Sequence, residues 1–230
     1  MSGVLSVPFA FLAVYLPESS RTLWFILAYA ALAFTAASYW KKTRTKLRLK
    51  FDKLDEFCYR PDVDLSSLNS QGQVLLVTKC DYYRIKIECD SIGVVSRVTG
   101  RLIDVKKLVD GKWVLALGGE PLTLTMAPAI PGSPSKDVFD QVPEPLDGIV
   151  LTEKPYPIQR NTKVAIPTEN FSLSSSLDPG KSFSLPGIYL FHFVVSSPDC
   201  KSASIDLKLD WTGDWKTSTV SENKSDKSSF

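Results

Sequence analysis

The side chains that could do chemistry are few in this chain and lie far apart in sequence. The single histidine, His192, lies in the apolar run YLFHFVV with no acidic residue nearby along the chain. The four cysteines form no C-x-x-C pair; they are Cys58, Cys80, Cys89 and Cys200. A zinc site needs Cys or His ligands at short spacing, and a nucleophile needs a base within hydrogen-bond reach. We therefore expect no enzyme, no metal and no cofactor.

The cysteine count leaves two alternatives for their chemical state. An even number allows two disulfides in an oxidising compartment, and it equally allows four buried free thiols in the cytosol. The orientation inferred below favours free thiols.

Binding of a small molecule would require a different set of side chains. A concave pocket with cationic and aromatic walls is the expected form of such a site. The residues best suited to it are Tyr82, Arg84, Arg97 and Arg101. The pair Trp211 and Trp215 could stack on a base or a sugar, although aromatic residues at strand ends usually cover a core.

An apolar segment at residues 22–40, TLWFILAYAALAFTAASYW, must position the rest of the chain. It holds 19 residues without a charge. As a helix it would span roughly 28 Å, close to the ~30 Å hydrocarbon layer of a bilayer. Trp24, Tyr39 and Trp40 lie near its ends, where aromatic side chains border lipid headgroups. We expect a transmembrane helix here.

A shorter apolar run at residues 3–16 precedes this helix, and the polar sequence PESSR at 17–21 separates the two. Fourteen residues are few for a full span. We therefore predict a helical hairpin with a short first arm as the membrane anchor, residues 1–41, with a single span at 22–40 as the alternative.

The charges of the chain are divided sharply by position. Residues 41–50 contain no acid and six bases: Lys41, Lys42, Arg44, Lys46, Arg48 and Lys50. Residues 51–230 hold 20 of the 27 basic and 24 of the 25 acidic side chains, a net charge of −4. The positive-inside rule places everything after residue 41 in the cytoplasm, on the inner membrane. The acidic body argues against nucleic-acid binding.

The basic segment has two interpretations. Lys41, Lys42, Arg44 and Lys46 either set the orientation and reach lipid headgroups, or recognise particular anionic lipids.

Residues 42–215 show the two-residue alternation of β-strands. It is clearest at 46–51, at 82–89 and in SASIDLKLDW at 202–211. Residues 94–108 are long for one strand and predict a bulge around Gly100. Residues 127–157 hold seven of the 15 prolines, which predicts loops and edge strands, with a linker between two domains as the alternative. Residues 216–230 predict a disordered tail. Several short strands with turns between them indicate a mainly β sandwich.

The segment LPGIYLFHFVV followed by SIDLKLDW resembles the closing hairpin of immunoglobulin-like domains, in which Gly-x-Tyr opens the penultimate strand. The whole order of segments, ending in W-T-G-D-W, resembles uncharacterised bacterial proteins with two membrane helices and a cytoplasmic immunoglobulin-like domain. The resemblance implies an antiparallel immunoglobulin-like β-sandwich and no activity. The B–F cysteine pair and the central tryptophan of antibody domains are missing, so no subfamily is implied.

Two functions are consistent with these sequence features. The first is a membrane-anchored, non-enzymatic module that binds an unknown protein partner. The second is a ligand-sensing effector, whose β domain binds a small molecule and acts through the membrane helices.

Overall fold

The structure is a computed structural model that describes residues 18–68, 74–90, 94–126, 135–156, 162–168 and 185–224. The chain divides into two compact units, residues 1–45 and 46–230, which are described separately. The predicted first arm of the anchor, residues 3–16, lies outside the described residues.

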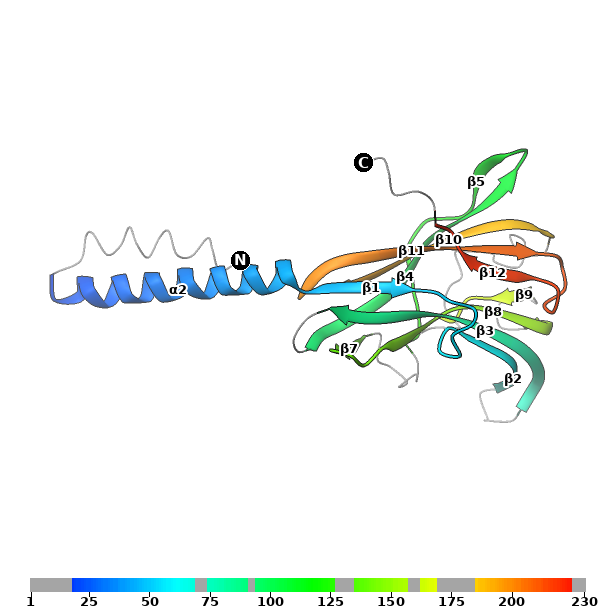
Figure 1. The fold of residues 1–230 in the computed structure, drawn as a ribbon, viewed down its shortest axis with the longest axis horizontal. Helices are drawn as coiled ribbons and strands as arrows, with labels where there is room; N and C mark the ends of the chain where they lie inside the picture. The colour runs from blue at the N-terminus through cyan, green and yellow to red at the C-terminus, as the bar shows by residue number, and fades with distance from the viewer. Residues whose placement is uncertain are drawn as a thin grey trace. The chain divides into compact units, whose positions relative to one another are not determined.

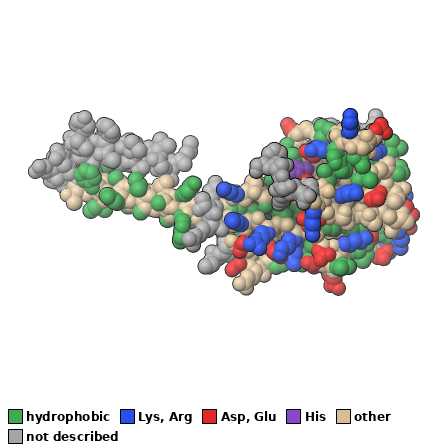
Figure 2. Space-filling view, turned by 45° about the horizontal axis from the view of Figure 1, so that its top comes forward, with side chains coloured by type: hydrophobic (Ala, Val, Ile, Leu, Met, Phe, Trp, Pro, Cys, Tyr) green, Lys and Arg blue, Asp and Glu red, His purple; other side chains and the backbone are tan. Residues whose placement is uncertain are grey.

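The first unit contains one described helix, α2 (Glu18–Arg44). Its segment Thr22–Trp40 is long and apolar enough to cross a membrane, by length and composition. Large apolar side chains along it are exposed, among them Leu23, Tyr29 and Phe34 at 60%, 77% and 70%. Figure 2 shows hydrophobic side chains along the visible face of this segment.

The second unit is a mainly β domain with twelve described strands. They are β1 (Lys46–Lys50), β2 (Tyr59–Leu68), β3 (Val74–Asp90), β4 (Val94–Val109), β5 (Lys112–Leu117), β6 (Leu122–Thr123), β7 (Lys136–Phe139), β8 (Glu144–Tyr156), β9 (Thr162–Ala165), β10 (Gly187–Ser197), β11 (Cys200–Trp211) and β12 (Thr219–Glu222).

The strands form one curled sheet with the order β5-β4-β10-β11-β1-β3-β8-β9. β1 joins its two halves, because it pairs antiparallel with β3 and parallel with β11. Figure 1 shows the sheet curling back, with β10 and β11 above and β3 and β8 below.

The core lies between the two halves of the sheet. On β3 the alternation places Tyr83, Ile85 and Ile87 inside, each at most 1% exposed. Facing strands β10 and β11 contribute Phe191, Phe193, Leu207 and Leu209 to the same cluster. The alternation predicted at 82–89 and 202–211 is confirmed.

The proline-rich region contains an inner strand, which corrects the prediction of loops and edges for residues 127–157. β8 lies between β3 and β9, and its Ile149, Val150 and Leu151 are at most 2% exposed. Its two prolines stand near its ends, at 145 and 155, so the residues between them keep every backbone N–H needed for the ladder. The prediction used the number of prolines, but their positions determine whether a segment can form an inner strand.

The predicted disordered tail also begins too early. Residues 219–222 form β12, which pairs with β11, and Val220 is 2% exposed. Residues 225–230 lie outside the described residues.

The predicted irregularity near Gly100 occurs on both sides of that residue. The pairing of β4 shifts between Val95 and Val98 against β7 and between Leu102 and Asp104 against β10. Gly100 itself pairs with Val195, and a Cβ there would stand 2.4 Å from a methyl carbon of buried Leu146. Close packing against β8 therefore favours glycine at this position, because any larger residue would have to displace the Leu146 side chain.

Strand directions define two ends of the β domain. Lys46 pairs with both Asp90 and Lys201, so the start of β1, the end of β3 and the start of β11 lie together. We call this the entry end, because the chain enters the domain at Lys46. β4 and β11 run in the direction of β1, so the β4–β5 turn and residues 212–218 lie at the opposite end, the far end.

Candidate functional site

Two of the four residues predicted to contact a ligand meet on β3. The Arg84 guanidinium carbon lies 5.2 Å from the centre of the Tyr82 ring. Arg84 Nε also donates to Asp147 Oδ1 at 2.6 Å, and the two side chains are only 16% and 11% exposed. Burial raises the pKa of Asp147, and the Arg84 charge opposes that rise. Arg84 therefore neutralises a buried carboxyl group.

The other two residues lie on β4, which in the described sheet pairs with β5, β6, β7 and β10 and not with β3. Arg97 and Arg101 are both exposed. Arg97 has a positive φ of 50°, and its backbone N–H donates to Asp137. The structure thus brings Tyr82 and Arg84 together and places Arg97 and Arg101 on another strand.

His192 has acidic neighbours that the linear sequence hides. Its Nδ1 lies 2.6 Å from Oδ1 of Asp206 on β11, and Asp104 on β4 is its partner on the other side. No acidic residue lies near His192 along the chain, but cross-strand pairs bring together residues distant in sequence. No group of three His, Cys, Asp or Glu among the described residues could hold a metal ion.

All four cysteines are free thiols and buried. Burial raises the pKa of Cys58, and it raises the pKa of Cys80 to about 12. A thiol reacts as its thiolate, so these two are poor nucleophiles at neutral pH.

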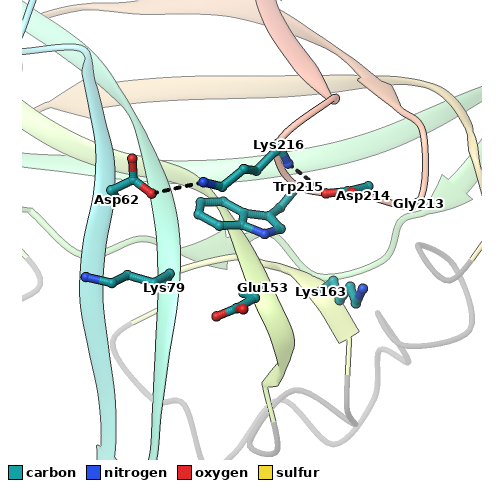
Figure 3. A pocket seen from close by; sticks show the side chains of 8 residues that line it. All are labelled: Asp62, Lys79, Glu153, Lys163, Gly213, Asp214, Trp215 and Lys216. Atoms are coloured by element: carbon teal, nitrogen blue, oxygen red, sulfur yellow. Dashed lines mark hydrogen bonds and ion pairs between the residues drawn. The ribbon is translucent and has the colours of Figure 1, made fainter.

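A hollow of about 650 Å³ lies among β2, β3, β8, β9 and the loop that follows β11 (Figure 3). Its walls carry one aromatic, three acidic and three lysine side chains: Trp215; Asp62, Glu153 and Asp214; Lys79, Lys163 and Lys216.

Three of the residues that line the hollow contact one another. Lys216 Nζ lies 5.0 Å from the centre of the Trp215 ring and 3.6 Å from Asp62 Oδ1. Trp215 is only 7% exposed. The loop is braced by Ser218 Oγ donating to the Asp214 carbonyl at 2.6 Å. Balanced charges of both signs suit a zwitterionic molecule, and stacking on Trp215 would require Lys216 to move.

The β4–β5 hairpin exposes apolar side chains on both faces. Val109, Trp113, Val114 and Leu115 are 43%, 42%, 50% and 61% exposed. β5 is the first strand in the sheet order, so one of its edges is unpaired in the described sheet. Long apolar edge strands are templates for another strand, and soluble domains usually protect them.

The turn of this hairpin is well defined. Asp110 and Gly111 have φ values of 49° and 76°, the pattern of a type I′ turn, which matches the twist of the flanking strands. The sequence carried a signal for the apolar edge that the prediction missed. The run WVLAL at 113–117 does not alternate, so a strand there must be apolar on both faces.

The described part of the chain therefore offers two surfaces at or toward the far end, the charged hollow and the apolar β5 edge. Neither contains the residues singled out from sequence at Arg84, Arg97 or Arg101. Comparison with protein-family models, with curated proteins and with solved structures gave no match.

Proposed function

We propose that the chain is a membrane-anchored, non-enzymatic interaction module. Helix α2 spans the inner membrane, the β domain lies on the cytoplasmic side, and the edge of β5 binds an extended segment of a partner protein. The exposed apolar edge of β5 is the observation that carries this proposal.

The positive charge of residues 41–50 supports the cytoplasmic orientation, although two of its six cations form ion pairs within the β domain. Arg48 pairs with Asp90 at 2.5 Å and Lys50 with Glu88 at 2.6 Å, so these two cations are neutralised within the β domain. The proposal assigns Lys41, Lys42, Arg44 and Lys46 to the lipid headgroups. Four cations against the single Arg21 at the other flank keep the bias toward a cytoplasmic domain.

Two contacts support an immunoglobulin-like sandwich as the finer description of the domain. The first strand is shared between the two halves of the sheet. Tyr189 near the start of β10 donates its hydroxyl to the Leu185 carbonyl at 2.6 Å, as in the tyrosine corner of such domains.

The free energy of binding at the β5 edge can be compared with the cost of association. Three apolar side chains of β5, Trp113, Val114 and Leu115, are about half exposed, so covering the rest is worth roughly 1 kcal/mol apiece. The total of about 3 kcal/mol falls below the ~4–15 kcal/mol cost of association. Backbone hydrogen bonds to a new strand and favourable charges must supply the remainder.

The charges of the hairpin indicate an acidic partner. Residues 104–117 carry three lysines, Lys106, Lys107 and Lys112, against Asp104 and Asp110, a net charge of +1; Oδ1 of Asp104 lies 3.9 Å from Nζ of Lys106. A second copy would bring the same positive charge to the edge. We therefore infer a partner segment with apolar residues at alternate positions and acidic residues beside them.

A photoreactive amino acid at Leu115 of the full chain, in cells, tests this function. We expect one adduct with a different protein, lost when Trp113→Glu removes apolar area and repels acidic side chains. The same photoreactive residue at Leu54, which is 92% exposed, is the matched control and should give no adduct. An adduct of twice the chain's mass would replace the acidic partner by a second copy, and absence of any adduct would overturn the proposal.

The hollow around Trp215 supports ligand sensing as a second candidate function. Its volume lies within the range of ~300–1,000 Å³ for small-molecule sites. Native mass spectrometry of the full chain would show a stoichiometric small ligand, lost on Asp62→Ala. A spectrum of the bare chain from several expression hosts would remove this candidate.

A further inference from the structure

The entry end of the β domain carries its own apolar group, separate from the β5 edge. Val94, Phe139 and Val142 are 38%, 50% and 52% exposed. Val94 is the direct cross-strand partner of Phe139, and the Val142 N–H donates to the Phe139 carbonyl at 3.3 Å. The three residues, which we call the entry patch, are therefore neighbours at one edge of the domain.

The entry end of the domain also carries a pair of cations and several carboxylates. Lys46 and Lys201 are exposed and lie opposite each other in the sheet. Asp90 is paired with Arg48. Asp199 and Asp137 accept hydrogen bonds from the backbone N–H groups of Ser96 and Arg97. Asp199 and Asp137 keep their negative charge in these bonds, so the positive charge at this end is local: Lys46 and Lys201 lie side by side and repel each other. An anionic surface would relieve that repulsion.

The length of the chain limits how far this end can stand from the anchor. Helix α2 ends at Arg44 and β1 begins at Lys46, with one residue between them. Four helical residues beyond Trp40 and two extended ones reach about 13 Å. The headgroup layer alone occupies about 5–8 Å on each side of a bilayer. If the helix spans the membrane, Lys46 can lie only just outside the headgroups.

We propose that the entry patch contacts the anionic lipid surface of the leaflet from which the helix emerges. Phe139 and the two valines enter the headgroup region, and Lys46 and Lys201 meet lipid phosphates. The inference rests on the proposed function in one respect, that α2 spans the bilayer. The tether supplies a high local concentration, so a small apolar patch is sufficient. The contact holds the domain upright, with the β5 edge at the far end directed toward soluble partners.

A fluorescent probe on a single introduced cysteine tests this contact in the full chain. The four native thiols are buried, so a new cysteine at Phe139→Cys is labelled selectively with an environment-sensitive dye. The chain is placed in vesicles that contain phosphatidylglycerol and a lipid spin-labelled near its headgroup. The matched control is Val74→Cys, an apolar site of 59% exposure at the far end. We expect a blue-shifted emission and spin-label quenching at 139, and neither at 74.

Each other outcome has a distinct meaning. Flotation of the chain with the vesicles but equal, weak quenching at both sites would overturn the lipid contact and leave the anchor intact. Failure to float would overturn the anchor itself, and with it the proposed function. Strong quenching at both sites would show a domain lying flat and overturn the upright orientation. Val142→Cys repeats the test should the Phe139 variant fail to fold.

Discussion

Replacing Arg84 with methionine should destabilise the β domain strongly. The substitution keeps the length of the side chain over Tyr82 but leaves Asp147 without its cation. Two unit charges about 4 Å apart attract by about 4 kcal/mol at an effective dielectric constant of ~20. Removing one partner of a buried pair costs about 3–5 kcal/mol. Because Arg84 keeps 16% exposure, we expect a loss of about 3 kcal/mol at pH 7.

The pH dependence of this loss gives a second readout. Burial raises the pKa of Asp147 above its ordinary value of 3.8, so the folded chain keeps a proton that the unfolded chain has released. Stability from that proton is present at low pH and is lost as pH rises through the folded pKa. Without Arg84 the pKa rises further. The deficit of the variant should therefore shrink as pH falls below 7.

Urea unfolding of the full chain in detergent, followed by near-ultraviolet circular dichroism, measures these free energies. The matched control is the double variant Arg84→Met with Asp147→Leu, which removes both charges and should recover most of the loss. A loss below about 1 kcal/mol for Arg84→Met, with no pH dependence, would refute the structural role of the ion pair. Arg84 would then be available to a ligand, as the sequence suggested.

Three further predictions concern packing, a single hydrogen bond and the thiols. Gly100→Ala places a methyl group against Leu146 and should cost about 1–3 kcal/mol in the same urea assay; a neutral effect would mean that the core yields there. Tyr189→Phe removes one hydrogen bond to a backbone carbonyl and should lower the free energy of unfolding by about 1 kcal/mol. An unchanged urea midpoint would show that this hydrogen bond does not stabilise the domain. Cys58 and Cys80 should resist a thiol reagent at pH 8 until urea unfolds the chain, and because their pKa values are raised, stability should fall as pH rises above 9; rapid native labelling would contradict their burial.

The sequence predicted what depends on local periodicity. The alternation at Tyr83, Ile85 and Ile87 marks β3, and the uncharged run that ends at Trp40 marks the helix. Both patterns follow from a single element meeting one environment, so a short window of residues contains the information.

The missed features depend on long-range pairing. Asp206 meets His192 only because β10 and β11 fold together. β8 is an inner strand because its prolines stand at its ends, which composition does not register. β12 exists because β11 offers an edge to residues 219–222. The hollow around Trp215 joins four strands and a loop, and no short stretch of sequence encodes it.

Access to a single cysteine tests the central claim, a β domain anchored on the cytoplasmic side. The native Cys58 and Cys200 cannot serve, because they are 0% and 3% exposed. Leu54→Cys adds a thiol at a site of 92% exposure in the turn between β1 and β2. A membrane-impermeant maleimide applied to intact cells that express this full-length variant should leave it unlabelled until the membrane is opened. Labelling in intact cells would place the β domain outside and contradict the account.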